Sequence, residues 1–152
     1  VSALLGEKSN HIVRVRDYGV DEKEIPFYVM EFLKGESLSE VIKFRPLALT
    51  RYLKIVRQIC FGLECAHKGI MFEGEMCPII HRDIKPENII IRPSGSLKLI
   101  DFGIAGNPST ALYSGTAGYV APDAISGEDR KYSIQGDLFG LGVTLFEWFF
   151  GK

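Results

Sequence analysis

A short run of catalytic-type side chains, His-Arg-Asp-Ile-Lys-Pro-Glu-Asn, occupies residues 81–88 of this chain. Its carboxylate (Asp83), ammonium group (Lys85) and carboxamide (Asn88) lie within six positions, and a second carboxylate, Asp101, follows thirteen residues after the amide. Asp83 could accept a hydroxyl proton, and Lys85 could neutralise phosphate oxygens. The side-chain oxygens of Asn88 and Asp101 are hard ligands of the kind that divalent cations prefer. These residue types therefore suit metal-assisted transfer of a phosphoryl group.

The elements around this run must hold the reactive side chains in place. Pro86 fixes its own φ and restricts the residue before it, which predicts a rigid loop. Residues 89–91 are apolar, residues 97–100 are apolar except for Lys98, and the Pro-Ser-Gly turn between them predicts a two-stranded hairpin. Asn88 precedes the first strand and Asp101 follows the second, so the hairpin would bring the two candidate metal ligands together.

The run 81–88 resembles the catalytic loop of eukaryotic-type (Hanks-type) serine/threonine protein kinases, H-R-D-L-x-x-x-N, with Ile84 at the Leu position. Asp101, Phe102 and Gly103 match the D-F-G motif of the same family. A lone D-F-G recurs by chance in many chains, but the order and spacing of the motifs together argue against a chance match. The resemblance implies an α+β, two-lobed kinase fold. It also implies transfer of the γ-phosphate of ATP to protein hydroxyl groups, with Mg²⁺ or Mn²⁺ as the cation.

The same resemblance assigns site residues by their positions in the family's motifs. Catalytic roles fall to Asp83, Lys85, Asn88 and Thr116, and metal binding falls to Asn88 and Asp101. The implied nucleotide contacts are the gatekeeper Met30, the backbone of Glu31 and Leu33, the pocket floor Ile90, and Glu36 or Ser37 at the ribose. Structural or regulatory positions are His81, Arg82, Phe102, Gly103, Asp123 and Asp137. Without the resemblance, Met30 could equally fill core space as a flexible thioether.

Residues 101–123 resemble an activation segment, for which the family pattern ends G-T-x-x-Y-x-A-P-E. Asp123 stands in place of the final Glu and is one methylene shorter. Thr116 matches the residue that bonds the catalytic Asp and Lys, and Asp137 matches the aspartate that bonds the backbone of the His-Arg-Asp turn. By the resemblance, Arg82 would contact a phosphate on the segment. The candidate phosphorylation sites are Ser109, Thr110, Tyr113 and Ser114, with Thr110 and Ser114 the first choices.

Two strands are predicted before the catalytic run. Residues 1–8 have the pattern of the end of a helix, residues 12–18 alternate as a strand, and residues 27–33 form a nearly continuous apolar run. The continuous apolar character of the second strand predicts burial on both of its faces. In the resemblance, residues 1–33 are the C-terminal part of the small lobe with the hinge, and residues 34–152 are the large lobe through its central helix.

Two helix starts are predicted between the strands and the catalytic run. Ser37 and Glu40 have the spacing of a capping box. Thr50 could cap a longer helix. The apolar positions of that helix step by three and four, at Leu53, Val56, Cys60, Leu63 and His67. On this pattern Cys60 is a core residue, and His67 caps the C-terminal end of the helix rather than binding a ligand.

Composition sets outer bounds on function. The 152 residues are 46% hydrophobic and 24% charged, as in a single globular domain. A net charge of −1 and a pI near 6.3 give no long-range attraction for nucleic acid or an anionic membrane, so we expect neither as a partner. The apolar block 138–150 is too short for a membrane span and contains Glu147, so it predicts a core helix. Three cysteines without C-x-x-C spacing favour a cytoplasmic location over a disulfide framework.

Two hypotheses from different functional classes follow. The sequence contains neither a G-x-G-x-x-G loop nor a V-A-I-K-type lysine, so it resembles an internal fragment of a kinase domain that we expect to be inactive alone. The parent protein is then either an active kinase, with ATP and a Ser/Thr-containing protein as its partners, or a catalytically inactive kinase-like scaffold or binding module. Because Asp83, Asn88 and Asp101 are all present, the sequence favours the enzyme.

Overall fold

The computed structural model describes residues 2–44, 48–72, 74–102, 115–122, 124 and 132–151. Its helices are α1 (Ser2–Lys8), α2 (Leu38–Phe44), α3 (Leu49–Lys68), the 3₁₀ helix η1 (Pro86–Asn88) and α5 (Ile134–Phe150). Its strands are β1 (Val15–Val20), β2 (Pro26–Met30), β3 (Glu36–Ser37), β4 (Ile70–Phe72), β5 (Glu75–Cys77), β6 (Ile89–Ile91) and β7 (Leu97–Leu99). Six residues to which the sequence analysis assigned a structural, regulatory or phosphorylation role lie outside the described ranges: Gly103, Ser109, Thr110, Tyr113, Ser114 and Asp123.

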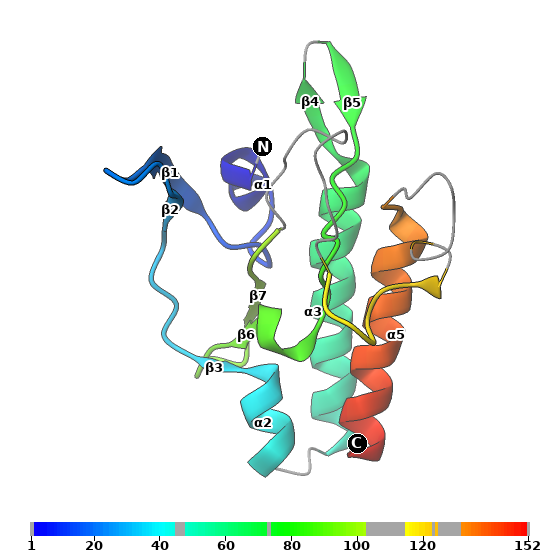
Figure 1. The fold of residues 1–152 in the computed structure, drawn as a ribbon. Helices are drawn as coiled ribbons and strands as arrows, with labels where there is room; N and C mark the ends of the chain where they lie inside the picture. The colour runs from blue at the N-terminus through cyan, green and yellow to red at the C-terminus, as the bar shows by residue number, and fades with distance from the viewer. Residues whose placement is uncertain are drawn as a thin grey trace.

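Within the described residues the strands form three antiparallel sheets. β1 pairs with β2, β4 pairs with β5, and the third sheet has the order β3-β6-β7. Figure 1 shows the β1–β2 hairpin on one side of a mainly helical part in which α3 and α5 run side by side. Tyr52 of α3 contacts Trp148 of α5, with ring centroids 4.5 Å apart. This α+β arrangement is the predicted fold class.

The β1–β2 sheet departs from the sequence-based prediction in the bounds of both strands and in burial. β2 spans Pro26–Met30 rather than residues 27–33. β1 begins at Val15 rather than residue 12, because Ile12 and Val13 run beside β7, where Val13 N donates to Leu99 O at 2.9 Å. The predicted burial of β2 on both faces is wrong, since all of its residues are exposed and Met30 keeps 43% of its accessible surface. Among the described residues β2 pairs only with β1, so its apolar side chains lack the flanking layers that bury a central strand.

Helix α3 buries a different face from the one predicted. Its buried residues are Ile55, Ile59, Gly62, Leu63 and Ala66. Cys60 is exposed, so its prediction as a core residue is wrong. Gly62 permits the observed face to pack closely, since a β-carbon at that position would lie only 2.8 Å from Leu99 Cδ1 of β7. The close contact between helix and hairpin therefore selects the buried face, and the apolar pattern of the helix alone does not.

Helix starts follow the local sequence where a side chain can bond the first-turn N–H groups. The predicted capping box of α2 is present: Ser37 N donates to Glu40 Oε2 at 2.8 Å, and Glu40 N donates to Ser37 Oγ at 3.3 Å. Ser133 caps α5 by accepting from Gly136 N at 3.1 Å. Thr50 is not a cap, because α3 begins one residue before it and lacks a side-chain cap bond.

Helix α5 is the core helix predicted from the apolar block at the end of the chain. Its buried residues recur every three or four positions and face the rest of the helical part: Asp137, Gly140, Leu141, Thr144 and Trp148. No helix in the described ranges is long and apolar enough to cross a bilayer.

Candidate active site

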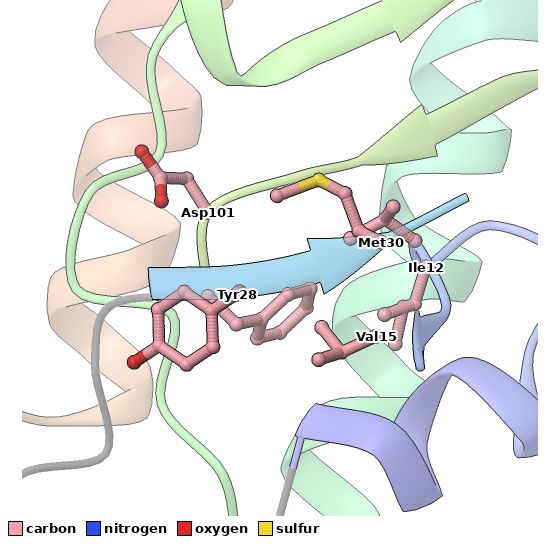
Figure 2. A pocket seen from close by; sticks show the side chains of 7 residues that line it. Ile12, Val15, Tyr28, Met30 and Asp101 are labelled. Atoms are coloured by element: carbon pink, nitrogen blue, oxygen red, sulfur yellow. The ribbon is translucent and has the colours of Figure 1, made fainter. Parts of the chain in front are cut away.

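A hollow opens between β2 and the chain that follows β7 (Figure 2). Tyr28 and Met30 are two residues apart on β2 and therefore share one face of the strand. They line the hollow together with Ile12, Val13, Val15, Asp101 and Phe102. Met30 thus lines the same space as the predicted metal ligand Asp101, and it is 43% exposed.

The other predicted nucleotide contacts lie on the segments after β2 and on the β3-β6-β7 sheet. Glu31 N donates to Arg14 O at 3.0 Å, so the carbonyl of Glu31 is the backbone group left for an adenine. Ser37 pairs with Ile90 across β3 and β6, which places the candidate ribose and floor residues side by side. The Ser37 hydroxyl donates to Glu40 Oε2 at 2.9 Å, so it already takes part in the capping box.

The catalytic-type run forms an extended segment that turns into η1. Lys85 has φ −155° and ψ 164°, the extended conformation expected before a proline. Pro86 opens the 3₁₀ helix, and Asn88 N donates to Lys85 O at 3.0 Å. The loop predicted from the proline is therefore present, and it turns the side chain of Asn88 back toward that of Asp83.

Asp137 of α5 bonds the start of the loop, as the family resemblance implies. One carboxylate oxygen accepts from His81 N at 2.8 Å, and the other accepts from Arg82 N at 2.8 Å. Asp137 is only 2% exposed, and His67 Nε2 also lies 2.8 Å from its Oδ2. Arg82 has φ 74°, an unfavourable conformation for a residue with a side chain, and the two bonds to Asp137 hold the turn in it.

His81 links the loop to the chain that carries Asp101. Its Nε2 lies 3.0 Å from Ile100 O, and because a carbonyl accepts, Nε2 carries the proton. Its Nδ1 then accepts from Asp83 N at 3.4 Å, and its ring contacts Phe102 with centroids 4.5 Å apart. Complete burial lowers the pKa of His81 despite the nearby Asp137 carboxylate, so the ring is a neutral spacer at neutral pH.

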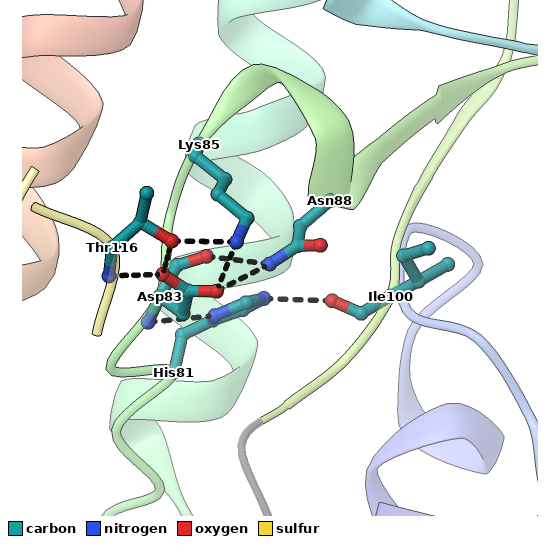
Figure 3. Close-up of polar contacts among 6 residues, drawn as sticks. All are labelled: His81, Asp83, Lys85, Asn88, Ile100 and Thr116. Carbon is teal, nitrogen blue, oxygen red and sulfur yellow. Dashed lines mark hydrogen bonds and ion pairs between the residues drawn. The ribbon is translucent and has the colours of Figure 1, made fainter. Parts of the chain in front are cut away.

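The carboxylate of Asp83 accepts hydrogen bonds on both oxygens (Figure 3). Oδ1 accepts from Thr116 Oγ1 at 2.8 Å and from Thr116 N at 3.0 Å. Oδ2 accepts from Lys85 Nζ at 2.7 Å and from Asn88 Nδ2 at 3.1 Å. Lys85 Nζ also donates to Thr116 Oγ1 at 2.6 Å, which closes the network. Four predicted catalytic residues from the loop and from the 115–122 segment therefore meet at one carboxylate.

The electrostatics of this network favour an ionised Asp83. Partial burial by itself would raise the pKa of the carboxyl group, but the hydrogen bonds from Lys85 and Thr116 outweigh it and the pKa is lowered. At neutral pH the group is therefore a carboxylate with fixed orientation, the form required of a proton acceptor.

Asn88 and Asp101 lie at the same end of the β6–β7 hairpin, as predicted. Ile100 N donates to Asn88 O at 3.0 Å. Asp101 is the next residue after Ile100, so it lies near Asn88. Asn88 Nδ2 donates to Asp83 O at 2.8 Å and to its carboxylate, so the amide oxygen is the group left for a cation. In the described ranges, no group of three or more His, Cys, Asp or Glu residues is arranged to hold a metal ion. A cation held here would thus use the oxygens of Asn88 and Asp101 and complete its shell from elsewhere.

The segment that carries Thr116 rests on helix α5. Tyr119 donates its hydroxyl to Glu147 of α5, and burial together with this carboxylate raises the pKa of the phenol. Gly140 lies beneath both loops: a β-carbon there would lie 3.0 Å from Ile84 O and 3.3 Å from Tyr119 O. A larger residue at position 140 would push the two loops apart, so α5 sets the spacing between Thr116 and the catalytic-type run.

Arg82 carries a guanidinium group that its surroundings leave partly unsatisfied. The group stacks on the Tyr132 ring, with the guanidinium carbon 4.8 Å from the centroid. Its buried Nε has no hydrogen-bond partner in the described part of the chain. A buried donor without a partner is costly, so this arginine is suited to receive an anion.

Two contacts of the site were missed by reasoning from sequence. His67 is not a C-terminal cap, because its ring bonds Asp137 and Gly69 closes the end of α3 instead. Lys98 of β7 is buried and reaches the Glu31 carboxylate. The second contact had a signal, namely a lysine between two leucines in an otherwise apolar strand. The first had none, because the two residues are 70 positions apart.

Comparison with known proteins matches the whole chain, residues 1–152, to the family model of the protein kinase domain. A serine/threonine-protein kinase A from Synechocystis sp. is 52% identical over 162 aligned residues, with 100% of this chain and 31% of the relative covered. A probable serine/threonine-protein kinase, pknA2 from Bifidobacterium longum, is 35% identical, with 93% of this chain and 18% of that protein covered. The chain thus spans less than a third of the length of these two relatives.

The fold is also similar to a solved structure. The kinase PK-1 of the Cydia pomonella granulovirus superposes with a TM-score of 0.78 at 20% sequence identity. The match covers 99% of this chain and 53% of the viral one.

Proposed function

The chain belongs to the protein kinase family, and on that premise we propose that the protein carrying it transfers the γ-phosphoryl group of ATP to serine or threonine hydroxyl groups of protein substrates. The observation that carries the proposal is the Asp83 carboxylate, which accepts from Lys85, Asn88 and Thr116 at 2.7 to 3.1 Å. The relatives described above are named as serine/threonine kinases, which supports the choice of substrate hydroxyl.

In this reaction Asp83 accepts the proton of the substrate hydroxyl as that oxygen bonds to the γ-phosphorus, while the bond to the β–γ bridging oxygen breaks. Lys85 would neutralise charge on the transferred oxygens, and its contacts with Asp83 and Thr116 support this role. Thr116 donates two hydrogen bonds to Oδ1 of Asp83 and so fixes the orientation of the carboxylate. Most of the catalysis in this chemistry is positioning, and the network supplies it.

The cation, Mg²⁺ or Mn²⁺, would be held by Asn88 Oδ1 and the Asp101 carboxylate. The donor set fits a hard divalent cation, and the amide of Asn88 is turned so that its nitrogen faces Asp83. When bound, the cation neutralises charge on the phosphate oxygens. Asn88 therefore links proton acceptance and metal binding in one side chain.

ATP would bind between two parts of the chain. Residues 1–33 would be the end of the small lobe with the hinge, and residues 34–152 would belong to the large lobe. The adenine would contact the Glu31 carbonyl and the backbone of Leu33, with Ile90 below it and Met30 beside it. The ribose would contact Glu36 or Ser37. The proposal includes no nucleic-acid partner, and the three free cysteines fit a cytoplasmic location.

The test is phosphoryl transfer by the full-length protein that carries this chain. With γ-labelled ATP, Mg²⁺ and a generic basic protein, we expect label on serine and threonine and not on tyrosine. ATP binding without any transfer would instead support the inactive scaffold. That alternative is not favoured, because Asp83, Asn88 and Asp101 are all present.

We also propose that phosphorylation on the 103–116 segment regulates the enzyme. The unpaired Nε of Arg82 is the observation that supports it. Mass spectrometry of the active protein should find a phosphate at Thr110 or Ser114, with Ser109 and Tyr113 as the other candidates. Active protein without phosphate anywhere between Gly103 and Thr116 would contradict this proposal.

A further inference from the structure

A lysine lies inside the molecule at a place that the proposed mechanism does not use. Lys98 is the central residue of β7, and its side chain is 7% exposed. Its neighbours Leu97 and Leu99 are fully buried. Lys98 pairs with Ile90 across β6 and β7, so it stands on the same sheet face as the candidate floor of the adenine site.

The ammonium group of Lys98 joins three separate segments. Its Nζ donates to Glu31 Oε1 at 2.5 Å and to Ile12 O at 2.9 Å. The first partner belongs to the candidate adenine segment, and the second belongs to the chain that runs between α1 and β1. Lys98 itself is three residues before the candidate metal ligand Asp101. We refer to Lys98, Glu31 and Ile12 as the Lys98 bridge.

Glu31, the partner of Lys98, is held at both its side chain and its backbone. Glu31 Oε1 accepts a second bond from Arg14 N at 2.9 Å, and Glu31 N donates to Arg14 O at 3.0 Å. Burial alone would raise the pKa of this carboxyl group, but the bonds from Lys98 and Arg14 lower it, so Glu31 is a carboxylate at neutral pH. The Glu31 carbonyl, which would face the adenine, therefore belongs to a residue bonded at both its backbone and its side chain.

Burying an ion pair is a poor way to gain stability, because desolvation of both charges offsets their attraction. A pair of apolar side chains would fill the same space at less cost. The feature that the ion pair adds is a fixed geometry between segments 67 positions apart in the sequence. The two segments that it joins are those assigned to the adenine and to the metal.

We propose that Lys98 is a positioning residue for nucleotide binding: the Lys98 bridge holds the adenine segment 31–33 at a fixed distance from the β7 end that carries Asp101. The inference rests on the proposed function, since it concerns the spacing between the adenine and metal sites. Without the bridge, segment 31–33 samples other positions, and ATP must select the competent one. The apparent dissociation constant for ATP is then the intrinsic constant divided by the fraction of the protein in the binding-competent conformation.

The test uses the full-length protein as wild type, Lys98→Met, Glu31→Gln and the double variant. Methionine keeps the apolar stem of Lys98, and glutamine keeps an acceptor for Arg14 N. In nucleotide-free protein we expect exchange of the Glu31 amide, the one N–H of residues 31–33 with a hydrogen bond in the described structure, to be about tenfold faster in each single variant. We also expect the ATP dissociation constant to rise about tenfold, which corresponds to a competent fraction of about one tenth. The double variant should be no worse than the worse single variant, because the two substitutions remove one interaction.

A matched control pair lies on the surface of α3. Lys68 Nζ and Glu64 Oε1 are 2.7 Å apart, but their side chains are 72% and 55% exposed. Lys68→Met should leave both the exchange of the Glu31 amide and ATP affinity unchanged.

The possible results distinguish failure of the Lys98 bridge from failure of the proposed kinase function. Unchanged exchange of the Glu31 amide in both single variants would overturn the Lys98 bridge, whatever the affinity for ATP. Faster exchange with unchanged ATP affinity would overturn its role in nucleotide binding. A wild type that binds no ATP would overturn the proposed function and the nucleotide part of this inference together. If Lys98→Met does not fold, the Glu31→Gln results decide.

Discussion

Replacement of Asp83 by asparagine tests the centre of the proposed mechanism. The carboxylate accepts four hydrogen bonds, two on each oxygen. An amide of the same shape keeps only one accepting oxygen. Whichever way it turns, its NH₂ group faces the donors of Thr116 or those of Lys85 and Asn88. Asp83→Asn thus removes the proton acceptor and also disturbs the groups around it.

Two magnitudes follow from this geometry. Loss of a general base reduces turnover by roughly 10²- to 10⁴-fold, or about 3 to 5 kcal/mol of activation free energy. The donors left unpaired cost about 1 to 3 kcal/mol of unfolding free energy, because they are partly buried. ATP affinity measured without Mg²⁺ should change little, since no nucleotide contact is assigned to the Asp83 carboxylate.

The assay is steady-state phosphoryl transfer by the full-length protein, with ATP affinity measured by calorimetry and unfolding followed in urea. The unfolding data ensure that turnover is compared for folded protein. Glu87→Gln is the control, because Glu87 is an exposed carboxylate in the same loop. If Asp83→Asn keeps more than about half of the wild-type turnover, its assignment as proton acceptor is wrong.

Three further predictions concern neighbouring residues. Asp101→Asn should weaken ATP binding on the order of tenfold in the presence of Mg²⁺ and not in its absence, and equal weakening in both conditions would argue against metal binding by Asp101. Asp137→Asn leaves only one accepting oxygen for the N–H groups of His81 and Arg82, so urea unfolding should show a loss of about 1 to 3 kcal/mol for each donor left unpaired. The lowered pKa of His81 means that its ring stays neutral in the folded protein as pH falls below the ordinary value of about 6.5, while the unfolded chain takes up a proton. Stability should therefore decrease below that pH, and nitrogen chemical shifts that show His81 protonated near pH 6 in the folded state would contradict its burial.

Local sequence predicted the parts of the site that depend on neighbouring residues. The spacing of Asp83, Lys85 and Asn88 predicted one loop, and Pro86 predicted its extended approach. The hairpin after the loop and the capping box of α2 were predicted for the same reason: turn residues and capping side chains act within a few positions. The family resemblance added the contacts of Thr116 and Asp137, which residue types alone do not supply.

Burial was not predictable from the same local patterns. The apolar run 27–33 predicted a strand buried on both faces, yet β2 is exposed, because burial depends on which other elements cover a strand. Cys60 fitted the apolar stripe of α3, but the helix turns its Gly62 face to β7, where the absence of a side chain allows close approach. In both cases the pattern of apolar residues did not determine burial, and the packing partner decided.

The sequence by itself determined which chemical groups this protein has and the order in which the loop, hairpin and helix α5 present them. Only the tertiary structure decided which charged groups meet. His67 reaches Asp137 across 70 positions, and Lys98 reaches Glu31 across 67. Spacing along the chain carries no information about such contacts. They form because a buried charge must find a partner, and the available partner depends on how distant elements pack.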